Sequence, residues 1–236
     1  MSAPQRLARI AGVLYLLVGI CGGFAEGVVQ PKVYVAGDAA ATAANVVAHA
    51  GLVRLGAVAD LLDQTAFVFL AMALYGLLQH VRQSVARAMV VLVALAAGIS
   101  CLNAVLEFEG LRVATDSAYA AAFGTAGAHA LVLLLLDTQH YGLLIAQIFF
   151  GLWLAPLGYL AYRSGWFPRA LGILLVVGSA CYLLDLLAAF LVPNASTAIH
   201  GFIVIPSAIA EIWMVGYLLV IGVKTSKPDN HVPAAA

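Results

Sequence analysis

Residues 85–106 read VARAMVVLVALAAGISCLNAVL, an almost wholly apolar stretch in which Arg87 is the one charged side chain. A helix needs about 20 such residues to cross the hydrocarbon core of a bilayer. Six stretches of the chain meet this requirement, and they are 7–28, 52–79, 85–106, 139–162, 167–191 and 199–222. The sequence therefore predicts six transmembrane helices.

Composition agrees with this prediction. Hydrophobic residues make up 64% of the 236 residues and charged residues 9%, whereas about 25% of residues in a water-soluble domain are charged. We predict an all-α, polytopic membrane helix bundle, with residues 1–223 as a single transmembrane domain and 224–236 as a disordered tail. Lys plus Arg and Asp plus Glu number 11 each, so the net charge says nothing about partners. The sequence has no basic aromatic patch, and we expect no nucleic-acid partner.

The basic residues predict the orientation of the bundle. With a cytoplasmic N-terminus, the cytoplasmic side collects Arg6, Arg9, Arg82, Arg87, Arg163, Arg169, Lys224 and Lys227. The opposite side holds only Lys32, Arg54 and Arg112. Cytoplasmic loops are enriched in Lys and Arg, so we expect both termini in the cytoplasm and the protein in the cell (inner) membrane.

Two connections on the outer side are longer than simple turns. Asp38 precedes AAATAANVVAHA and is expected to cap a short helix that leads into the second span. The second connection, 110–138, contains an apolar piece at 126–136 that is too short to span. We expect this piece to lie at the membrane interface or over the mouth of the bundle, with Asp137 or Thr138 capping the next helix.

Each predicted span carries one polar stripe, because its polar and small residues recur every three or four positions. The stripes are Tyr15, Gly19, Gly22 and Glu26; Gly56, Asp60, Asp63 and Phe67; Ser100, Asn103 and Glu107; Asp137, His140, Leu144, Gln147 and Gly151; Gly178, Tyr182 and Asp185; and His200, Ser207 and Glu211. Stripes turned inward predict a polar cavity that opens to the outer side and is closed toward the cytoplasm.

An ionisable residue near the bilayer centre costs roughly 2.5–3.5 kcal/mol, so a bundle with no use for such residues would be more stable with leucine. The predicted ligand-binding residues are Arg54, Asp60, Asp63, His140, Asp185, Glu211, Glu26 and Asn103. Arg54 does not share a helix face with Asp60, and we expect it to pair with Glu26, Asp185 or Glu107. Glu107 and Glu109 are expected to be solvated at the end of the third span.

Several functions remain open at this stage. The leading hypothesis is a protein that binds a small molecule or lipid, in contact with the bilayer and of undetermined oligomeric state. An intramembrane enzyme, metal-dependent or acid-base, acting on a lipid-like substrate is the first alternative. A transporter is the second, and a structural network of hydrogen-bonded acids is the third. A zinc site is indicated only by position, with His49, His140 and His200 on three outer elements.

Short motifs along nearly the whole chain resemble a bacterial integral-membrane family known as domain of unknown function 4386. They are RIAGVLY at 9–15, DAAATAAN at 38–45, LGAVADLL at 55–62, LYGLL at 74–78, HYG at 140–142, FFG at 149–151, GYLAYRSG at 158–165, PRALG at 168–172, YLLD at 182–185, and Glu211. The resemblance implies a multi-pass membrane protein and no particular activity. The family-like positions Arg54, Asp60, His140, Asp185 and Glu211 coincide with the predicted site. Leu154-Ala155-Pro156 departs from the pattern where a further histidine is expected, which weakens a metal hypothesis.

Overall fold

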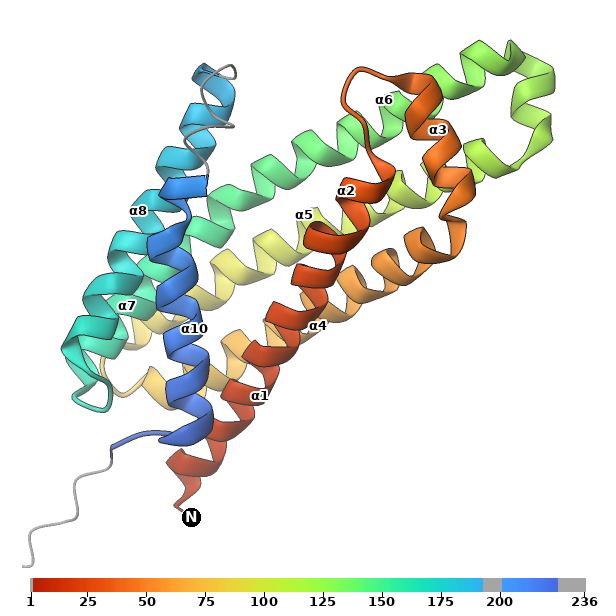
Figure 1. Ribbon diagram of the computed structural model, residues 1–236. Helices are drawn as coiled ribbons and strands as arrows, with labels where there is room; N and C mark the ends of the chain where they lie inside the picture. Colours follow the sequence, from red (N-terminus) through yellow and green to blue (C-terminus); the bar gives the residue numbers. More distant parts are fainter. Residues whose placement is uncertain (1, 193–200, 225–236) are drawn as a thin grey trace, which may run out of the picture.

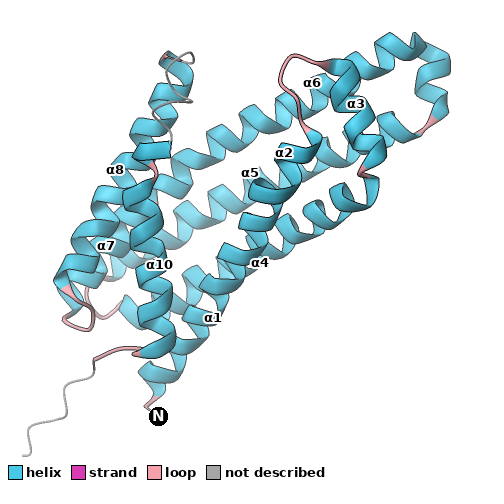
Figure 2. Ribbon diagram, in the orientation of Figure 1, coloured by secondary structure: helices cyan, strands magenta, loops and turns pink. Residues whose placement is uncertain are grey.

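Helices form all the regular structure of the computed structural model, which describes residues 2–192 and 201–224 (Figure 2). In chain order they are α1 (Ala3–Phe24), the π-helical turn η1 (Ala25–Val29), α2 (Gln30–Val33), α3 (Ala39–Ala48), α4 (Ala50–Leu78), α5 (Gln83–Thr115), α6 (Ser117–Leu152), α7 (Leu154–Ser164), α8 (Arg169–Leu191) and α10 (Ile205–Val220). Six segments in the described part are long and apolar enough to cross a membrane. The predicted all-α bundle with six spans is confirmed.

The helices form two groups that meet near the N-terminus (Figure 1). One group contains α1, α4, α5 and α6, in which α5 packs mainly on α6 and α4, and α4 packs on α1. The other contains α7, α8 and α10, in which α8 packs on both neighbours. Contacts of α10 with α1, and of α8 with α6, join the groups. A polar site inside the bundle therefore lies between helices that are far apart in sequence.

The connected ends of α5 and α6 differ from the prediction. The apolar piece at 126–136 was expected to be a separate interfacial or lid segment, but it belongs to α6. Leu136 lies against Gly110 of α5, and Val132 is fully buried. Asp137 and Thr138 lie within α6, and the N-terminal cap is Asp116, whose carboxylate accepts from the amide of Ala118 at 2.9 Å. The piece is too short to span alone, but packing along α5 stabilises it.

The length of α5 and α6 carries them beyond a bilayer. At 1.5 Å per residue, the 33 residues of α5 span about 50 Å and the 36 residues of α6 about 54 Å, less the bend at Gly124. The hydrocarbon core is about 30 Å thick, so both helices exceed it even when tilted by about 40°. We call α2, α3 and residues 107–136 the distal arm, which extends to the upper right in Figure 1.

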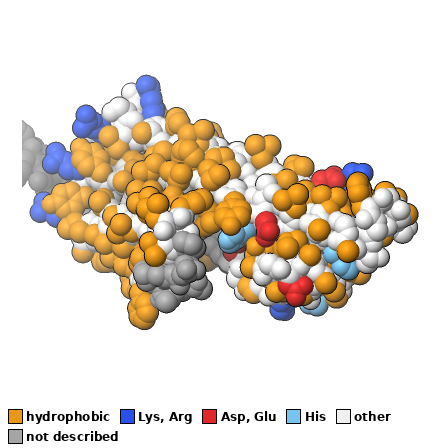
Figure 3. Space-filling view, turned by 90° about the horizontal axis from the view of Figure 1, so that it is seen from above, with side chains coloured by type: hydrophobic (Ala, Val, Ile, Leu, Met, Phe, Trp, Pro, Cys, Tyr) orange, Lys and Arg blue, Asp and Glu red, His pale blue; other side chains and the backbone are white. Residues whose placement is uncertain are grey.

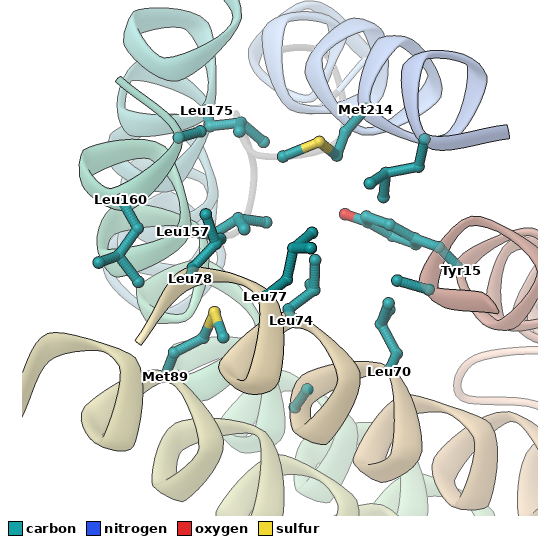
Figure 4. Close-up of a cluster of buried hydrophobic side chains, with 14 of the residues drawn as sticks. Tyr15, Leu70, Leu74, Leu77, Leu78, Met89, Leu157, Leu160, Leu175 and Met214 are labelled. Carbon is teal, nitrogen blue, oxygen red and sulfur yellow. The ribbon is translucent and has the colours of Figure 1, made fainter. Parts of the chain in front are cut away.

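Two separate apolar cores hold the bundle together. The larger core joins α1, α4, α5, α7, α8 and α10, and Figure 4 shows Leu70, Leu74 and Leu77 of α4 facing side chains from the other helices. The smaller core lies in the distal arm, where Val46, Leu111 and Val132 pack together. Along α1, α4, α5 and α6 the two clusters are separated by a stretch that carries polar side chains.

Basic residues gather at one end of the bundle, which we call the basic end. They are Arg6, Arg9, Arg82, Arg87, Arg163, Arg169 and Lys224, at the start of α1, α5 and α8 or near the end of α4, α7 and α10. Arg9 donates to the carbonyl of Val220 at 3.3 Å, and the amide of Lys224 donates to the carbonyl of Trp166 at 3.3 Å. These hydrogen bonds join the end of α10 to α1 and to the loop between α7 and α8. Figure 3 shows most Lys and Arg side chains on the left of the molecule.

The close approach of α7 to α8 depends on two glycines. A Cβ atom at Gly158 would lie 2.6 Å from the carbonyl oxygen of Gly172, and a Cβ at Gly172 would lie 2.8 Å from that of Gly158. Small residues allow helix backbones to approach closely inside membranes, where packing provides much of the attraction between helices. The glycines of the GYLAYRSG and PRALG motifs therefore act as a packing contact.

Asp38 caps α3 as predicted. Its carboxylate accepts a hydrogen bond from the amide of Ala41 at 2.9 Å, and α3 leads into α4 through His49. Replacement of Asp38 by alanine is expected to cost about 1 kcal/mol of local stability, because the amide loses its acceptor. Amides in the first turn of α3 should exchange with deuterium about fivefold faster. Asp38→Asn retains an acceptor and is the matched control, and equal exchange in both variants would contradict a capping role.

Candidate functional site

A cavity of about 480 Å³ lies inside the bundle between the two apolar cores. Its walls come from α1, η1, α4, α5, α6, α8 and α10. Glu26 both lines the cavity and is exposed, so the cavity opens to the outside of the protein beside η1. The larger apolar core lies between the cavity and the basic end. Apolar packing thus closes the cavity toward the basic end, and its predicted opening to the outer side of the membrane stays a prediction.

Four acidic side chains line the cavity. Asp63 is buried, Asp60 and Glu211 are half-buried, and Glu26 is exposed at the opening. Within the described part of the chain, no Lys or Arg side chain lines the cavity with them. The one ion pair among the described residues, Glu109 with Arg112 at 3.2 Å, lies on the exposed side of α5. The acids of the cavity therefore have no basic residue to balance them there.

Amide and hydroxyl side chains fill the space between the acids. The cavity is lined by the side chains of Gln64, Asn103, Gln139, Gln147 and Ser100. Five side-chain atoms are buried and have no hydrogen-bond partner among the described residues. They are Asp63 Oδ1, Gln64 Oε1, Ser100 Oγ, Asn103 Nδ2 and Gln147 Oε1. Buried polar atoms are nearly always hydrogen-bonded in proteins, so this group of atoms requires partners from water or a ligand.

Glu211 is the best-held acid of the four. The hydroxyls of Tyr15 and Tyr182 donate to its two carboxylate oxygens, at 2.9 and 3.3 Å. Tyr15 packs edge-on against Trp153, with ring centroids 5.6 Å apart, and Trp153 packs on Phe67 at 4.9 Å. The part of the cavity around Glu211 is therefore walled by aromatic rings.

Local helix geometry brings α1 close to the acids of α4. The turn η1 is π-helical, a form that occurs mostly as single turns and often at functional sites. It carries Glu26 to the opening of the cavity. One turn earlier, a Cβ on Gly22 would lie 3.4 Å from Asp63 Oδ2, an ordinary contact distance, so α1 packs directly beside Asp63.

The cavity lies at a distance from the basic end of the bundle, measured along the helix axes. At 1.5 Å per residue, Glu211 is about 14 Å from the end of α10 at Val220, and Asp63 is about 22 Å from the end of α4 at Leu78. Asn103 is about 30 Å from the start of α5. Along these helices the lining residues thus lie between about 14 and 30 Å from the basic end.

The structure brings together five of the eight predicted site residues, Glu26, Asp60, Asp63, Asn103 and Glu211. Asp185 is buried on α8 but does not line the cavity. His140 is exposed and stacks on Tyr34, with centroids 5.7 Å apart. Arg54 is exposed and forms no ion pair with any described residue, so its expected pairing with Glu26, Asp185 or Glu107 is wrong. The face of α4 that carries Arg54 points away from the acids.

Two predicted stripes match the wall of the cavity only in part. On α6 the cavity is lined by Gln139, Leu143, Gln147 and Phe150, whereas His140 and Leu144 lie on the adjacent face. On α1, Val18 lines the cavity in place of Gly19, which is exposed. The sequence prediction missed Gln64 and Gln139. Gln139 stands eight residues before Gln147, two helical turns away, and this spacing is the signal that could have identified it.

Two further hydrogen bonds lie near Asp137 on α6. Tyr34 donates to Asp137 at 2.5 Å, and Gln30 donates to Gln139 at 3.2 Å. Tyr34 lies just beyond the first span, and burial, together with the bond to Asp137, raises the pKa of its hydroxyl. Tyr34 therefore keeps its proton at neutral pH and remains a donor. Together these bonds tie the end of the first span to α6.

The environment of Glu107 corrects another prediction. Glu107 was expected to be solvated at a helix end, but it is only 5% exposed, because α5 continues to Thr115 and packs against α6. Glu109, on the other side of the helix, is exposed and pairs with Arg112 as expected of a solvated acid. Glu107 is therefore buried because α5 is longer than the sequence predicted.

A metal centre is not assembled within residues 2–192 and 201–224, where no group of three or more His, Cys, Asp or Glu side chains is placed to hold an ion. His49 lies between α3 and α4, and His140 stacks on Tyr34. His200 lies outside the described residues, so the three-histidine hypothesis and its zinc ion stay a prediction.

Comparison with known proteins identifies a family match but no activity. The family model described as domain of unknown function (DUF4386) matches residues 10–222. An uncharacterized protein of Archaeoglobus fulgidus is 43% identical over 54 residues, which cover 22% of this chain. The match spans only 33% of that relative's own length. No solved structure shows a significant match.

Proposed function

Because this chain belongs to the family described as domain of unknown function 4386, a description that includes no activity, we propose a function from the cavity itself. The protein is a multi-pass membrane protein that binds a small molecule, or the head group of a membrane lipid, in the polar cavity of its bundle. Catalysis on a lipid-like substrate or transport of a solute would both begin with this binding. Binding is therefore the property to test first.

The observation that carries the proposal is the group of buried polar atoms without partners. Each such atom costs about 1–3 kcal/mol when it is left unsatisfied, and the cavity collects five of them from α4, α5 and α6. A purely structural network would have paired them with one another. The volume of about 480 Å³ also falls within the range of small-molecule sites, about 300–1,000 Å³.

The basic end supports an orientation for the site. We expect this end, with both chain termini, to face the cytoplasm, because Lys and Arg are enriched on that side of membrane proteins. The cavity would then lie in the outer half of the cell (inner) membrane and open outward beside Glu26. Cysteine substitutions of Arg6 and of Lys32, labelled in intact cells with an impermeant maleimide, test the orientation. We expect labelling at position 32 alone.

The Asp60→Asn/Asp63→Asn double variant tests the binding site. Both changes remove charge and keep the shape of the side chain. We expect the bound ligand seen by native mass spectrometry of wild-type protein to fall at least tenfold. Stability of the ligand-free variant should be equal to or above that of the wild type, since the two carboxylates lie one helical turn apart and repel each other when ionised.

Glu109→Gln is the matched control, because it removes an acid from α5 outside the cavity. It should leave the bound mass unchanged. The proposal fails if the double variant keeps the same bound mass as the wild type. It also fails if wild-type protein released directly from native membranes carries no bound mass. A loss of stability without a change in bound mass would instead support a structural network.

A further inference from the structure

The unpartnered atoms of the cavity are mainly hydrogen-bond acceptors. Asp63 Oδ1, Gln64 Oε1 and Gln147 Oε1 all lack a donor among the described residues. The orientation of the Gln64 amide is set by its Nε2, which donates to Asp63 Oδ2 at 2.7 Å and leaves Oε1 pointing elsewhere. Asp63 and Gln64 are 7% and 5% exposed. A ligand that satisfies these atoms must supply several N–H or O–H donors.

The acidic side chains of the cavity indicate which kind of donor group the ligand carries. Four acids line the cavity, and no Lys or Arg of the described chain lines it with them. A neutral donor such as a sugar hydroxyl would leave these acids unbalanced, and an anionic ligand would add to their repulsion. A protonated amine supplies up to three donors and one positive charge, and hydrogen bonds between ionised groups are about twice as strong as neutral ones.

The shape of the cavity favours an organic amine over a metal ion. Asp63 and Glu211 lie at different levels, about 22 Å and about 14 Å from the basic end, and within the described ranges no three His, Cys, Asp or Glu side chains are placed to hold an ion. Tyr15, Phe67 and Trp153 wall the part near Glu211 and provide apolar and ring surface for a carbon skeleton or an ammonium group. An ion alone would leave most of 480 Å³ unfilled.

From these three observations we propose that the ligand carries a protonated primary amine. The source is either a free alkyl or arylalkyl amine or the ethanolamine head group of a lipid, which present the same primary ammonium. Asn103 is 8% exposed, and its Nδ2 is a hydrogen-bond donor without a partner among the described residues. An acceptor oxygen near the amine of the ligand would therefore satisfy Asn103 as well. This inference rests on the proposed function and names the chemical class of its ligand.

Isothermal titration calorimetry of the full chain in detergent at pH 7 tests the ammonium directly. The probes are 2-phenylethylamine, its neutral analogue 2-phenylethanol, its quaternary analogue trimethyl(2-phenylethyl)ammonium, and the anion 3-phenylpropanoate. We expect the primary amine to bind at least tenfold more tightly than the alcohol and the quaternary ion, because only the primary amine combines charge with several donors. The anion should bind most weakly.

The Asp63→Asn variant extends the test to a single charge. It keeps an acceptor for Gln64 and should weaken binding of the amine at least tenfold, with binding of the alcohol unchanged. Glu109→Gln should leave both unchanged. Equal loss of amine and alcohol in Asp63→Asn would contradict recognition of charge, and so would unchanged binding of the amine. The probe series on the wild type decides the question even if the variant does not fold.

The source of the amine is decided in lipid nanodiscs. If the ligand is a lipid head group, phosphatidylethanolamine nanodiscs should weaken binding of 2-phenylethylamine at least tenfold relative to phosphatidylcholine nanodiscs. Equal affinity in both lipids identifies a free amine. Different results would refute the ammonium proposal and the proposal that the cavity binds a ligand at all. Tight binding of the alcohol or the anion refutes only the ammonium, whereas no binding of any probe, together with no resident bound mass, refutes the cavity as a site.

Discussion

Replacement of Gly172 by alanine is expected to lower the free energy of unfolding by about 3 kcal/mol, at the upper end of the usual cost of overpacking. The added Cβ would lie 2.7 Å from the Cβ of Tyr162, 2.8 Å from the amide nitrogen of Tyr162 and 2.8 Å from the carbonyl oxygen of Gly158. None of these atoms is the end of a flexible side chain. The clash can be relieved only if α7 and α8 move apart, which loses their packing.

Equilibrium unfolding by SDS in mixed micelles, followed by circular dichroism, measures this effect. Gly98→Ala is the control, because a Cβ at Gly98 meets no atom within 4 Å on the exposed side of α5. The control should be as stable as the wild type or slightly more stable, since alanine favours helix. If Gly172→Ala were as stable as Gly98→Ala, the close contact between α7 and α8 would be wrong.

Replacement of Glu211 by alanine is expected to cost about 2 kcal/mol of stability, unlike the change of Asp60 and Asp63 to amides. Glu211 accepts from two tyrosine hydroxyls, and alanine would leave both without the carboxylate acceptor that orients them. A buried hydroxyl left without its partner costs about 1–3 kcal/mol. Glu211 therefore both holds α1, α8 and α10 together and lines the cavity.

Glu211→Gln separates these two roles of the side chain. Its amide oxygen can accept from one hydroxyl and its amide nitrogen can donate to the other, so the stability should fall by less than about 1 kcal/mol. The same unfolding measurement compares the three proteins. An alanine variant that unfolds like the glutamine variant would show that the tyrosine contacts contribute nothing to the fold.

The helical fold and the level of the site could be predicted from short stretches of sequence. The run at 85–106 is apolar over the length of a bilayer, and lipid offers no partner to an open backbone, so it must be a helix. The stripe of Gly56, Asp60, Asp63 and Phe67 needed only the helical period, and all of it except Gly56 lines the cavity. These inferences succeed because hydrophobic length and period are local properties.

Other features required packing partners that are remote in the sequence. The piece at 126–136 is too short to span a membrane, and only contact with α5 makes it part of a long helix. The choice between Gln139 and His140 for the wall of the cavity is a rotation of α6 by about 100°, which depends on how α6 lies against α5 and α8. Arg54, expected beside the acids, lies on the outer face of α4.

The sequence by itself determined that this chain is a six-span helical membrane protein with acids in its interior, because the cost of placing backbone and charge in lipid depends on each segment alone. Only the tertiary structure decided that Tyr15 and Tyr182 hold Glu211, and that Asp63, Gln64 and Gln147 face a common cavity without partners. Those contacts join α1, α4, α6, α8 and α10, and their free energy depends on distances between helices that no single segment specifies.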